Sequence, residues 1–372
     1  MSPEKVEMSS HFEIYSGKSV LITGHTGFKG SWLALWLSML GAKVTGLSLG
    51  APTVPSHFEA AHLQDLLVRD VRGDIRDELL VNDLIGSTKP DFIFHLAAQP
   101  LVHRSLISPR ETFDVNVVGT ASVLDAVKNR LRNCVVVVAT SDKCYKNEEV
   151  GKPFVESDPL GGHDPYSASK AGTELVIEAY RTSFFSSDAG SPIRLSSVRA
   201  GNVIGGGDWG ESRIVPDAVR AISEQKVLEV RNPRSIRPWQ HVLDPLSGYL
   251  HLASMMALSQ TPDQLCSAWN FGPQQSEGVS VQKLLEKLFE VWGSGSWAGS
   301  NSDYAGIEAK TLSISIEKAK RELNWQPTWD IDTSISQTAK WYRKFYSDPS
   351  QSMYESSREC IGEFTRSLNS CA

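Results

Sequence analysis

The sequence has no apolar run long enough to cross a membrane. None of its hydrophobic stretches reaches the ~18 residues that a transmembrane helix needs. Its first residues lack the charged and then apolar pattern of a secretory signal. Blocks of basic residues are also missing, and 37 Lys and Arg are outnumbered by 43 Asp and Glu, which argues against a nucleic-acid surface. We therefore expect a cytoplasmic globular protein without a membrane or nucleic-acid partner.

Cysteine is scarce as well, and its positions indicate neither a disulfide framework nor a zinc site. The five cysteines have no paired spacing of the kind found in zinc sites or secreted scaffolds. No set of His, Cys and carboxylates has the spacing of metal ligands, so we expect no metal. The 372 residues are enough for one large or two medium domains.

What the sequence does contain, close to its start, is a glycine-rich turn. The apolar run 19–23 predicts a strand, and the amphipathic run 32–40 predicts a helix. The glycines between them are spaced three apart, which is typical of a turn that brings backbone N–H groups close to a pyrophosphate. Cofactor contacts are expected from the segment that carries Gly24, Thr26, Gly27, Phe28, Lys29 and Gly30.

Two later passages are expected to complete the cofactor site. Asp74 and Ile75 could present a carboxylate and an apolar side chain to an adenine ring. The predicted strand 92–95 ends in His95, which we expect in the core. It leads into residues where a cofactor backbone could lie close, namely Leu96, Ala97, Ala98 and Gln99. The strand around 44–48 ends in neither the acidic residue that usually binds the adenosine ribose nor an Arg, so it does not decide between NAD and NADP.

Two segments about twenty residues apart carry groups that can transfer protons. The run 135–139 predicts a buried parallel strand. The second segment reads as the start of a helix in which Tyr166 and Lys170, four residues apart, share one face. The strand is followed by two hydroxyl residues, a carboxylate and an amine: Thr140, Ser141, Asp142 and Lys143.

These groups suit an oxidation followed by a second reaction. A phenol has a pKa of about 10, which the Lys170 cation and a cationic nicotinamide ring would both lower. Tyr166 can then take a proton from an alcohol while a hydride leaves the same carbon, and Ser141 can hydrogen-bond the same oxygen. Asp142 and Lys143 exceed what alcohol oxidation requires, so they indicate a further step on the substrate.

Candidate phosphate ligands follow later in the chain. Asn202 ends another predicted strand, 195–203, and is placed to donate to a phosphate. Arg213 and Arg237 suit a diphosphate because guanidinium groups bind phosphate oxygens in a bidentate fashion. We expect these three residues to bind the substrate.

Together, the glycine turn and the two proton-transfer segments resemble the extended short-chain dehydrogenase/reductase family, over roughly residues 17–346. Within it the chain is most similar to the nucleotide-sugar 4,6-dehydratases. Relatives acting on dTDP-glucose and GDP-mannose usually carry Asp-Glu after the hydroxyl residue, whereas Asp142-Lys143 is typical of the branch that acts on CDP-glucose. By the same resemblance, Arg237 matches the phosphate-binding arginine of the family.

The resemblance implies a redox-neutral dehydration of CDP-D-glucose on tightly held NAD, in a homodimer or homotetramer. Tyr166 would take the proton of the 4-hydroxyl as hydride passes to NAD, and Asp142 would protonate the departing 6-hydroxyl. Return of the hydride to C6 gives CDP-4-dehydro-6-deoxy-D-glucose, which would feed deoxysugar synthesis such as the 3,6-dideoxyhexoses of lipopolysaccharide O-antigen. Lys143 is either a neutral base for the C5 proton or a cation that stabilises the enolate.

The fold expected is α/β, with a Rossmann-type doubly wound parallel sheet and a smaller, interleaved α/β substrate-binding domain. Residues 1–16 and 347–372 are expected to be tails. Residues 17–203 and about 236–268 would form the NAD-binding domain, and 204–235 with 269–346 the nucleotide-sugar-binding domain. The helices around 111–127 and 168–185 carry more apolar residues than one core face needs; in the family the corresponding helices form a dimer interface, although the pattern alone is equally that of core.

Two other functions are compatible with parts of this pattern. An epimerase or decarboxylase of the same family would share the glycine turn, Tyr166 and Lys170, but would not need an acid such as Asp142. A non-catalytic NAD-sensing protein would be free to lose Tyr166 or Lys170, yet both are present.

Overall fold

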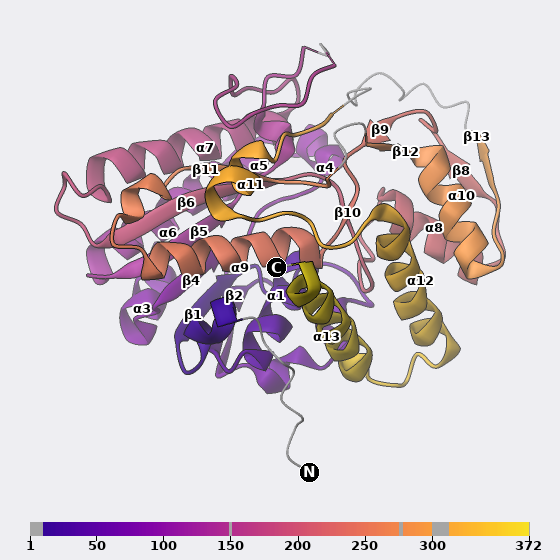
Figure 1. The fold of residues 1–372 in the computed structure, drawn as a ribbon, viewed down its shortest axis with the longest axis horizontal. Coiled ribbons are helices and arrows are strands. Elements are labelled where there is room, and N and C mark those ends of the chain that lie inside the picture. Colours follow the sequence, from indigo (N-terminus) through magenta and orange to yellow (C-terminus); the bar gives the residue numbers. More distant parts are fainter. Residues whose placement is uncertain (1–9, 149–150, 275–277, 300–311, 372) are drawn as a thin grey trace.

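A parallel β-sheet of seven strands forms the centre of the molecule (Figure 1). The computed structural model describes residues 10–148, 151–274, 278–299 and 312–371. The strands are β1 (Ser19–Thr23), β2 (Lys43–Ser48), β3 (Arg69–Arg72), β4 (Phe92–His95), β5 (Cys134–Ala139), β6 (Ile193–Ala200) and β11 (Ala268–Phe271). Their order is β11-β6-β5-β4-β1-β2-β3, so the chain changes direction across the sheet between β1 and β4. Ligands of open α/β sheets bind beyond the carboxyl ends of the strands at such a point.

Helices bury both faces of this sheet. In β5, Val135 and Val137 pack into one core and Val136 and Val138 into the other, because successive side chains of a strand point to opposite faces. The continuous apolar run at 135–138 is therefore what a strand covered on both sides requires. One face is covered by α1 (Phe28–Met39), α9 (Leu243–Leu258) and α13 (Tyr354–Cys371), the other by α3 (Glu78–Thr88), α6 (Gly119–Arg130) and α7 (Pro165–Phe184). The predicted doubly wound α/β fold is confirmed.

Beside the sheet lies a smaller group of short strands and helices, labelled on the right of Figure 1. Strand β10 pairs with β7, β12 with β9 and β13 with β8. Among its helices, α10 is amphipathic: Leu284, Leu285 and Leu288 are buried, Ser280 caps its start and Gly293 ends it at φ 87°. The elements are β7 (Val203–Ile204), α8 (Ile214–Ser223), β8 (Leu228–Val230), β9 (Ile236–Arg237), β10 (Gln240–His241), β12 (Val279–Ser280), α10 (Val281–Trp292), β13 (Trp297–Gly299) and α12 (Ile331–Ser347).

Several short helices lie between these elements. They are η1 (Ser10–Tyr15), α2 (His57–Ala60), η2 (Leu63–Leu66), α4 (Val102–Ile107), α5 (Pro109–Phe113), η3 (Asp114–Val118, a π-helix), η4 (Asp142–Cys144), η5 (Pro262–Gln264) and α11 (Glu317–Leu323). Within the described ranges, no helix combines the length and the apolar character that a membrane span requires.

The segments 1–16 and 347–372, expected to be tails, pack into the core in the parts that the structure describes. At the N-terminal end, Phe12 and Tyr15 of η1 are buried, and the Tyr15 hydroxyl donates to the Leu250 carbonyl at 2.6 Å. At the C-terminal end, Phe364 of α13 is fully buried, with its ring centroid 5.6 Å from that of Trp36. Both segments cover the core face that α1 and α9 also cover, so they complete the fold. Residues 1–9 lie outside the described part.

The expected boundary at residue 268 also needs correction. Strand β11 pairs in parallel with β6 from Ala268 to Phe271, so residues 269–271 belong to the central sheet. Trp269 and Phe271 are fully buried there. Strand Ala268–Phe271 is only four residues long and pairs with β6, some seventy residues earlier in the chain. The sequence around it therefore contains no local pattern from which the boundary could be predicted.

Candidate active site

The glycine turn predicted between residues 24 and 30 joins β1 to α1 at the point where the strand order reverses. Gly24 has φ +79°, and a Cβ there would lie 2.7 Å from the Ala97 nitrogen. A Cβ on Gly30 would lie 2.1 Å from the Gly24 carbonyl oxygen. Both positions therefore require glycine, and Gly27, the N-cap of α1, offers the first-turn N–H groups no side-chain partner. This geometry suits a pyrophosphate at the helix N-terminus.

Other predicted cofactor residues in this region differ in their surroundings. Thr26 donates its hydroxyl within the protein, to the Leu49 carbonyl at 3.2 Å, so it ties the turn to the end of β2. Phe28 is half-buried at the start of α1. Burial lowers the pKa of Lys29 to about 8, and the charge of Asp142 partly opposes this fall. The Lys29 side chain therefore lies near the proton-transfer groups. Its ammonium lies 6.0 Å from the Tyr249 ring centroid.

The passage after β4 lies beside the glycine turn, as predicted. Leu96 and Ala97 donate their backbone N–H groups to Thr23 of β1, and Ala98 is half-buried. The Gln99 backbone is held by Asn116 of η3, which accepts from the Gln99 nitrogen at 2.8 Å and donates to its carbonyl at 3.1 Å. Sequence reasoning missed Asn116, because a single Asn in a helix gives no signal of its distant partner.

His95 is the core residue that the sequence predicted. Its ring nitrogens contact the hydroxyls of Thr23 at 2.6 Å and Thr120 at 3.0 Å. Burial lowers its pKa to about 3, so the ring is neutral at physiological pH.

Asp74 and Ile75 follow β3, and both have contacts within the protein. Asp74 pairs with Arg76 at 2.6 Å, and the hydrogen bond from Arg76 lowers the pKa of the carboxyl. Ile75 is 4% exposed and packs in the core, with its Cδ1 atom against Gly119. The carboxylate thus already has a partner, and the apolar side chain supports α6.

The proton-transfer groups meet at the end of β5 and the start of α7. Ser141 begins η4, accepts from the Lys143 nitrogen at 3.2 Å and donates to Asp142 at 3.0 Å. On α7, Tyr166 and Lys170 are buried one turn apart, and Lys170 donates to the Ala139 carbonyl at 3.4 Å. Burial raises the pKa of Tyr166 to about 12, while a hydrogen bond with Ser141 and the charge of Arg213 act in the opposite direction.

Asp142 is a buried carboxyl among several cations. It is 3% exposed, and burial raises the pKa of its carboxyl, against the charges of Lys143, Lys29 and Arg237. Its Oδ2 atom has no hydrogen-bond partner in the part of the chain that the structure describes, and a Cβ on Gly201 would lie 3.1 Å from it. A buried oxygen without a partner is costly, so this atom is suited to a group that a substrate would bring. Lys143 is half-buried on the same turn.

The predicted phosphate ligands converge on this centre. Arg213, the N-cap residue of α8, pairs with Asp208 at 2.8 Å and lies close enough to Tyr166 to affect its pKa. Arg237 is buried, donates to the Ile236 carbonyl at 2.8 Å and acts on Asp142. Asn202 is half-buried at the end of β6, and its carbonyl accepts from the Gln240 nitrogen at 3.1 Å.

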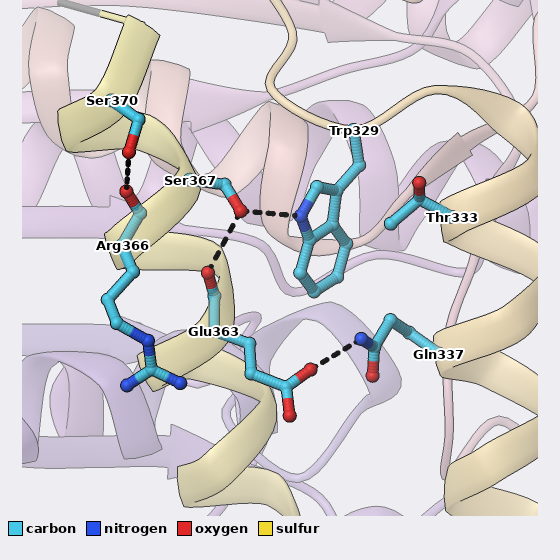
Figure 2. A pocket seen from close by; sticks show the side chains of 7 residues that line it. All are labelled: Trp329, Thr333, Gln337, Glu363, Arg366, Ser367 and Ser370. Carbon is cyan, nitrogen blue, oxygen red and sulfur yellow. Dashed lines mark hydrogen bonds between the residues drawn. The ribbon is translucent and has the colours of Figure 1, made fainter.

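A separate cavity of about 370 Å³ lies between α12 and α13 (Figure 2). Trp329 donates to Ser367 at 3.3 Å and Gln337 to Glu363 at 2.5 Å, so its polar side chains largely pair with one another. None of the predicted site residues lines it. Among the described residues, no cluster of three His, Cys or carboxylate side chains is arranged to hold a metal ion.

Comparisons with known proteins agree with this geometry. A family model described as GDP-mannose 4,6 dehydratase matches residues 21–338. A curated CDP-glucose 4,6-dehydratase of Salmonella typhimurium is 44% identical over 334 residues, which are 88% of this chain and 91% of that protein. The solved structure of DesIV, a dTDP-glucose 4,6-dehydratase from Streptomyces venezuelae with NAD and TYD bound, matches with a TM-score of 0.74 and 24% identity over 89% of this chain and 99% of its own. The epimerase Mth375 of Methanothermobacter thermautotrophicus has the same fold, with a TM-score of 0.77 and 22% identity over 93% of this chain and 98% of its own. The chain therefore belongs to the GDP-mannose 4,6-dehydratase family.

Proposed function

We propose that this protein is a CDP-glucose 4,6-dehydratase, which converts CDP-D-glucose into CDP-4-dehydro-6-deoxy-D-glucose and water. The observation that carries the proposal is the buried Asp142 carboxyl beside Ser141 and Tyr166, because alcohol oxidation alone has no use for it. The preference for a cytidine nucleotide is supported by the 44% identity to the Salmonella typhimurium enzyme of that name.

The residues around the glycine turn fit a dinucleotide cofactor. Gly24 and Gly30 leave space that a Cβ would fill, and the N-terminus of α1 has no side-chain cap. NAD is the cofactor named in the solved dehydratase structure from Streptomyces venezuelae. When bound, NAD would accept a hydride from C4 of the sugar and later give it back to C6.

In the first step, Tyr166 takes the proton of the 4-hydroxyl as the hydride leaves C4. Ser141 would hold the same oxygen by turning its hydroxyl from Asp142 to the substrate, and the charge of Arg213 favours the phenolate. Because burial raises the Tyr166 pKa to about 12, the phenolate needs positive charge nearby. Arg213 acts on the Tyr166 pKa in this direction, and Lys170, one turn further along α7, is the second cation proposed to do so.

In the second step, the new ketone acidifies the C5 hydrogen, and water is lost across C5 and C6. Asp142 gives its proton to the departing 6-hydroxyl, and burial raises the pKa of its carboxyl, which favours the protonated form. Lys143 stands on the same turn, either as the base that takes the C5 proton or as a cation beside the enolate. A proton then returns to C5 as the hydride returns to C6, so the net change is the loss of one water.

The nucleotide diphosphate is assigned to Asn202, Arg213 and Arg237. Two arginines near the catalytic carboxyl can neutralise the diphosphate and orient the sugar toward Tyr166. We divide the chain accordingly into a cofactor-binding sheet, which includes β11, and a substrate-binding part that contains α8, α10 and α12.

The test is the mass of the product formed from each of four nucleotide sugars. Purified protein with NAD is incubated separately with CDP-, dTDP-, UDP- and GDP-linked hexoses, and the products are analysed by mass spectrometry. Loss of one water from CDP-glucose alone is the expected result. Loss from another nucleotide sugar would overturn the substrate, and a change of configuration at constant mass would show an epimerase.

We also propose that the enzyme is a homodimer that works in the cytoplasm and supplies 3,6-dideoxyhexose synthesis. Exposed apolar side chains on neighbouring helices support the dimer: Leu106, Ile107, Phe113, Val118 and Leu175. The four cysteines whose side chains the structure describes, including the partly exposed Cys266, are free, which is in keeping with a reducing compartment.

A further inference from the structure

A buried ion pair lies directly behind the catalytic lysine. Glu174 follows Lys170 by one turn of α7, and its partner Arg199 comes from β6. The Arg199 Nε and Nη2 atoms each donate to one carboxylate oxygen at 2.9 Å, in a bidentate arrangement. The two side chains are 4% and 3% exposed. A buried pair of this kind costs desolvation energy, so a well-packed apolar pair would serve stability equally well.

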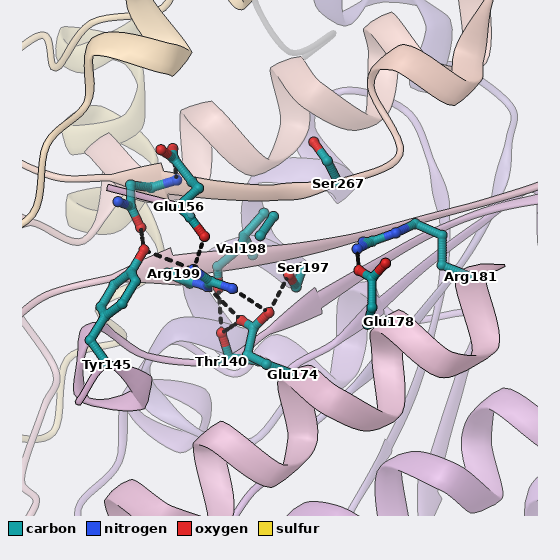
Figure 3. Close-up of polar contacts among 12 residues, drawn as sticks. Thr140, Tyr145, Glu156, Glu174, Glu178, Arg181, Ser197, Val198, Arg199 and Ser267 are labelled. Atoms are coloured by element: carbon teal, nitrogen blue, oxygen red, sulfur yellow. Dashed lines mark hydrogen bonds and ion pairs between the residues drawn. The ribbon is translucent and has the colours of Figure 1, made fainter. Parts of the chain in front are cut away.

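The pair is the centre of a polar network that holds both ends of the catalytic turn (Figure 3). Before the turn, the Thr140 hydroxyl donates to Glu174, and Ser197 donates to the same carboxylate at 2.7 Å. After the turn, the Tyr145 hydroxyl accepts from Arg199 at 2.8 Å. Ser141, Asp142 and Lys143 lie between these two attachments, so the network fixes the turn that carries them.

Among the described residues, Glu174 is the carboxylate whose charge acts on Lys170. The titratable groups that act on it or are acted on by it are Glu174 of α7, Cys144 of η4, His95 of β4, and Lys29 of α1. Tyr166 stands one turn before it on α7. Burial lowers the pKa of His95 to about 3 and raises that of the Cys144 thiol, so both are neutral near pH 7.

Glu174 is therefore the ionised negative group of this set. Burial alone would raise its pKa, but the hydrogen bonds and charge of Arg199 hold it below the usual value. Burial lowers the pKa of Lys170 to about 8, and the charge of Glu174 is the largest influence against that fall.

We propose that Glu174, held by Arg199, is a positioning residue that keeps Lys170 protonated and in place beside Tyr166. The inference rests on the proposed function, in which the Lys170 cation favours the Tyr166 phenolate. Without the Glu174 charge, Lys170 loses its proton at lower pH, and Tyr166 then loses the cation that lowers its own pKa. The alkaline limb of the C4 oxidation, where Lys170 loses its proton, therefore moves to lower pH. The acid limb, where Tyr166 becomes a phenolate, moves to higher pH.

The test replaces Glu174 by Gln, which keeps the shape of the side chain but not its charge. In Glu174→Gln, the alkaline limb of the C4 oxidation rate moves down by about one pH unit or more. The rate is followed in single turnover through the absorbance of the reduced nicotinamide. The pKa of Lys170 should fall by the same amount in the unliganded protein. It is measured by titrating the 13C-labelled ε-carbon of Lys170, whose signal is assigned by comparison with Lys170→Arg.

Two further variants separate the charge from a purely structural role. Arg199→Lys loses the bidentate contact but keeps both charges, so it loses stability while the Lys170 titration stays in place. The double variant Glu174→Gln/Arg199→Gln leaves no buried cation unpaired, so it tests the effect of the Glu174 charge if Glu174→Gln does not fold. In this variant too, Lys170 should titrate at lower pH than in the wild type.

An unchanged Lys170 titration in both Gln variants, or an equal shift in Arg199→Lys, would overturn the inference. Because that titration is measured without substrate, it still decides the role of Glu174 if the wild-type protein does not dehydrate CDP-glucose. In that case only the proposed function fails.

Discussion

Asp142 differs from an ordinary surface carboxylate in both burial and partners. One of its oxygens accepts from Ser141 at 3.0 Å, and the other has no hydrogen-bond partner among the described residues. Burial raises its pKa, although three cations nearby act against the rise. A protonated carboxyl can give its proton to a leaving hydroxyl, whereas an ionised one cannot. The residue is therefore suited to the elimination step and not to the oxidation.

Replacing Asp142 by Asn is expected to separate the two half-reactions. Asn still accepts a hydrogen bond from Ser141 but has no proton to give, so C4 oxidation should persist while water loss slows by about 10²–10⁴-fold. The reduced nicotinamide then accumulates, which its absorbance reports, and mass spectrometry finds no dehydrated sugar. In the wild type, elimination should fall as the pH rises through the raised Asp142 pKa, and the variant should lack this limb.

Lys143→Gln provides the comparison for this result. It should also stall before elimination, whether Lys143 is the base or a cation beside the enolate, but it retains the Asp142 proton. Dehydration at the wild-type rate in Asp142→Asn would show that another group is the acid.

The connection between α9 and α12 depends on a second buried carboxyl. Asp244, in the first turn of α9, is fully buried and accepts backbone hydrogen bonds from Thr328 at 2.6 Å and Trp329 at 3.3 Å. Its Oδ2 atom is buried, and none of the described residues forms a hydrogen bond with it. Burial raises its pKa to about 7, so the folded protein binds a proton here that the unfolded chain, with a pKa near 4, has already lost.

This proton makes the stability depend on pH in a defined direction. The contribution of Asp244 is fully present below about pH 4 and is lost as the pH rises through about 7. Asp244→Asn removes the dependence, so its stability relative to the wild type should rise by about 2–3 kcal/mol between pH 5 and 8. Urea unfolding at both pH values measures this difference. The exposed Asp65→Asn serves as the control and should show no such trend, and a pH-independent Asp244→Asn difference would contradict the role.

The elements that could be predicted from the sequence are those with a local cause. Gly24 and Gly30 are required by close contacts within one turn, and the run at 135–138 by a strand buried on both faces. Helix α13 was missed although Ile361 and Phe364 have helical spacing, because the polar residues around them concealed it.

The candidate site also has a part that could be predicted from the sequence and a part that could not. The proximity of Ser141, Asp142 and Lys143 could be predicted, because they are adjacent in the chain. Glu174 and Arg199 are 25 residues apart, and their pairing depends on how α7 packs against β6. No local sequence pattern predicts this packing. The Lys29 side chain lies on the helix that the glycine turn begins, but its direction toward Asp142 follows from the packing of α1.

At the scale of the whole molecule, one region of the surface combines several exposed apolar side chains. Ile107 of α4, Val118 of η3 and Leu175 of α7 are 70%, 52% and 61% exposed. Helix α7 contacts α4, α5 and η3, so these side chains belong to neighbouring elements. Such groups mark interaction surfaces in proteins that otherwise expose apolar side chains singly. Val118 and Leu175 lie in the segments 111–127 and 168–185, whose apolar excess predicted either core or a dimer interface, whereas Ile107 lies outside both.

A charge in this surface should dissociate the dimer without unfolding the protomer. In Leu175→Glu each protomer would bury an unpaired carboxylate at the interface, so the dimer should weaken by at least about 100-fold, or roughly 3 kcal/mol. Leu79→Glu on α3 is the matched control, because Leu79 is 80% exposed and lies on another helix. Sedimentation equilibrium should give twice the 40.9 kDa chain mass for the wild type and for Leu79→Glu, and the chain mass itself for Leu175→Glu. A monomeric wild type would refute the dimer, and a dimeric Leu175→Glu would move the interface elsewhere, leaving these apolar side chains without a partner.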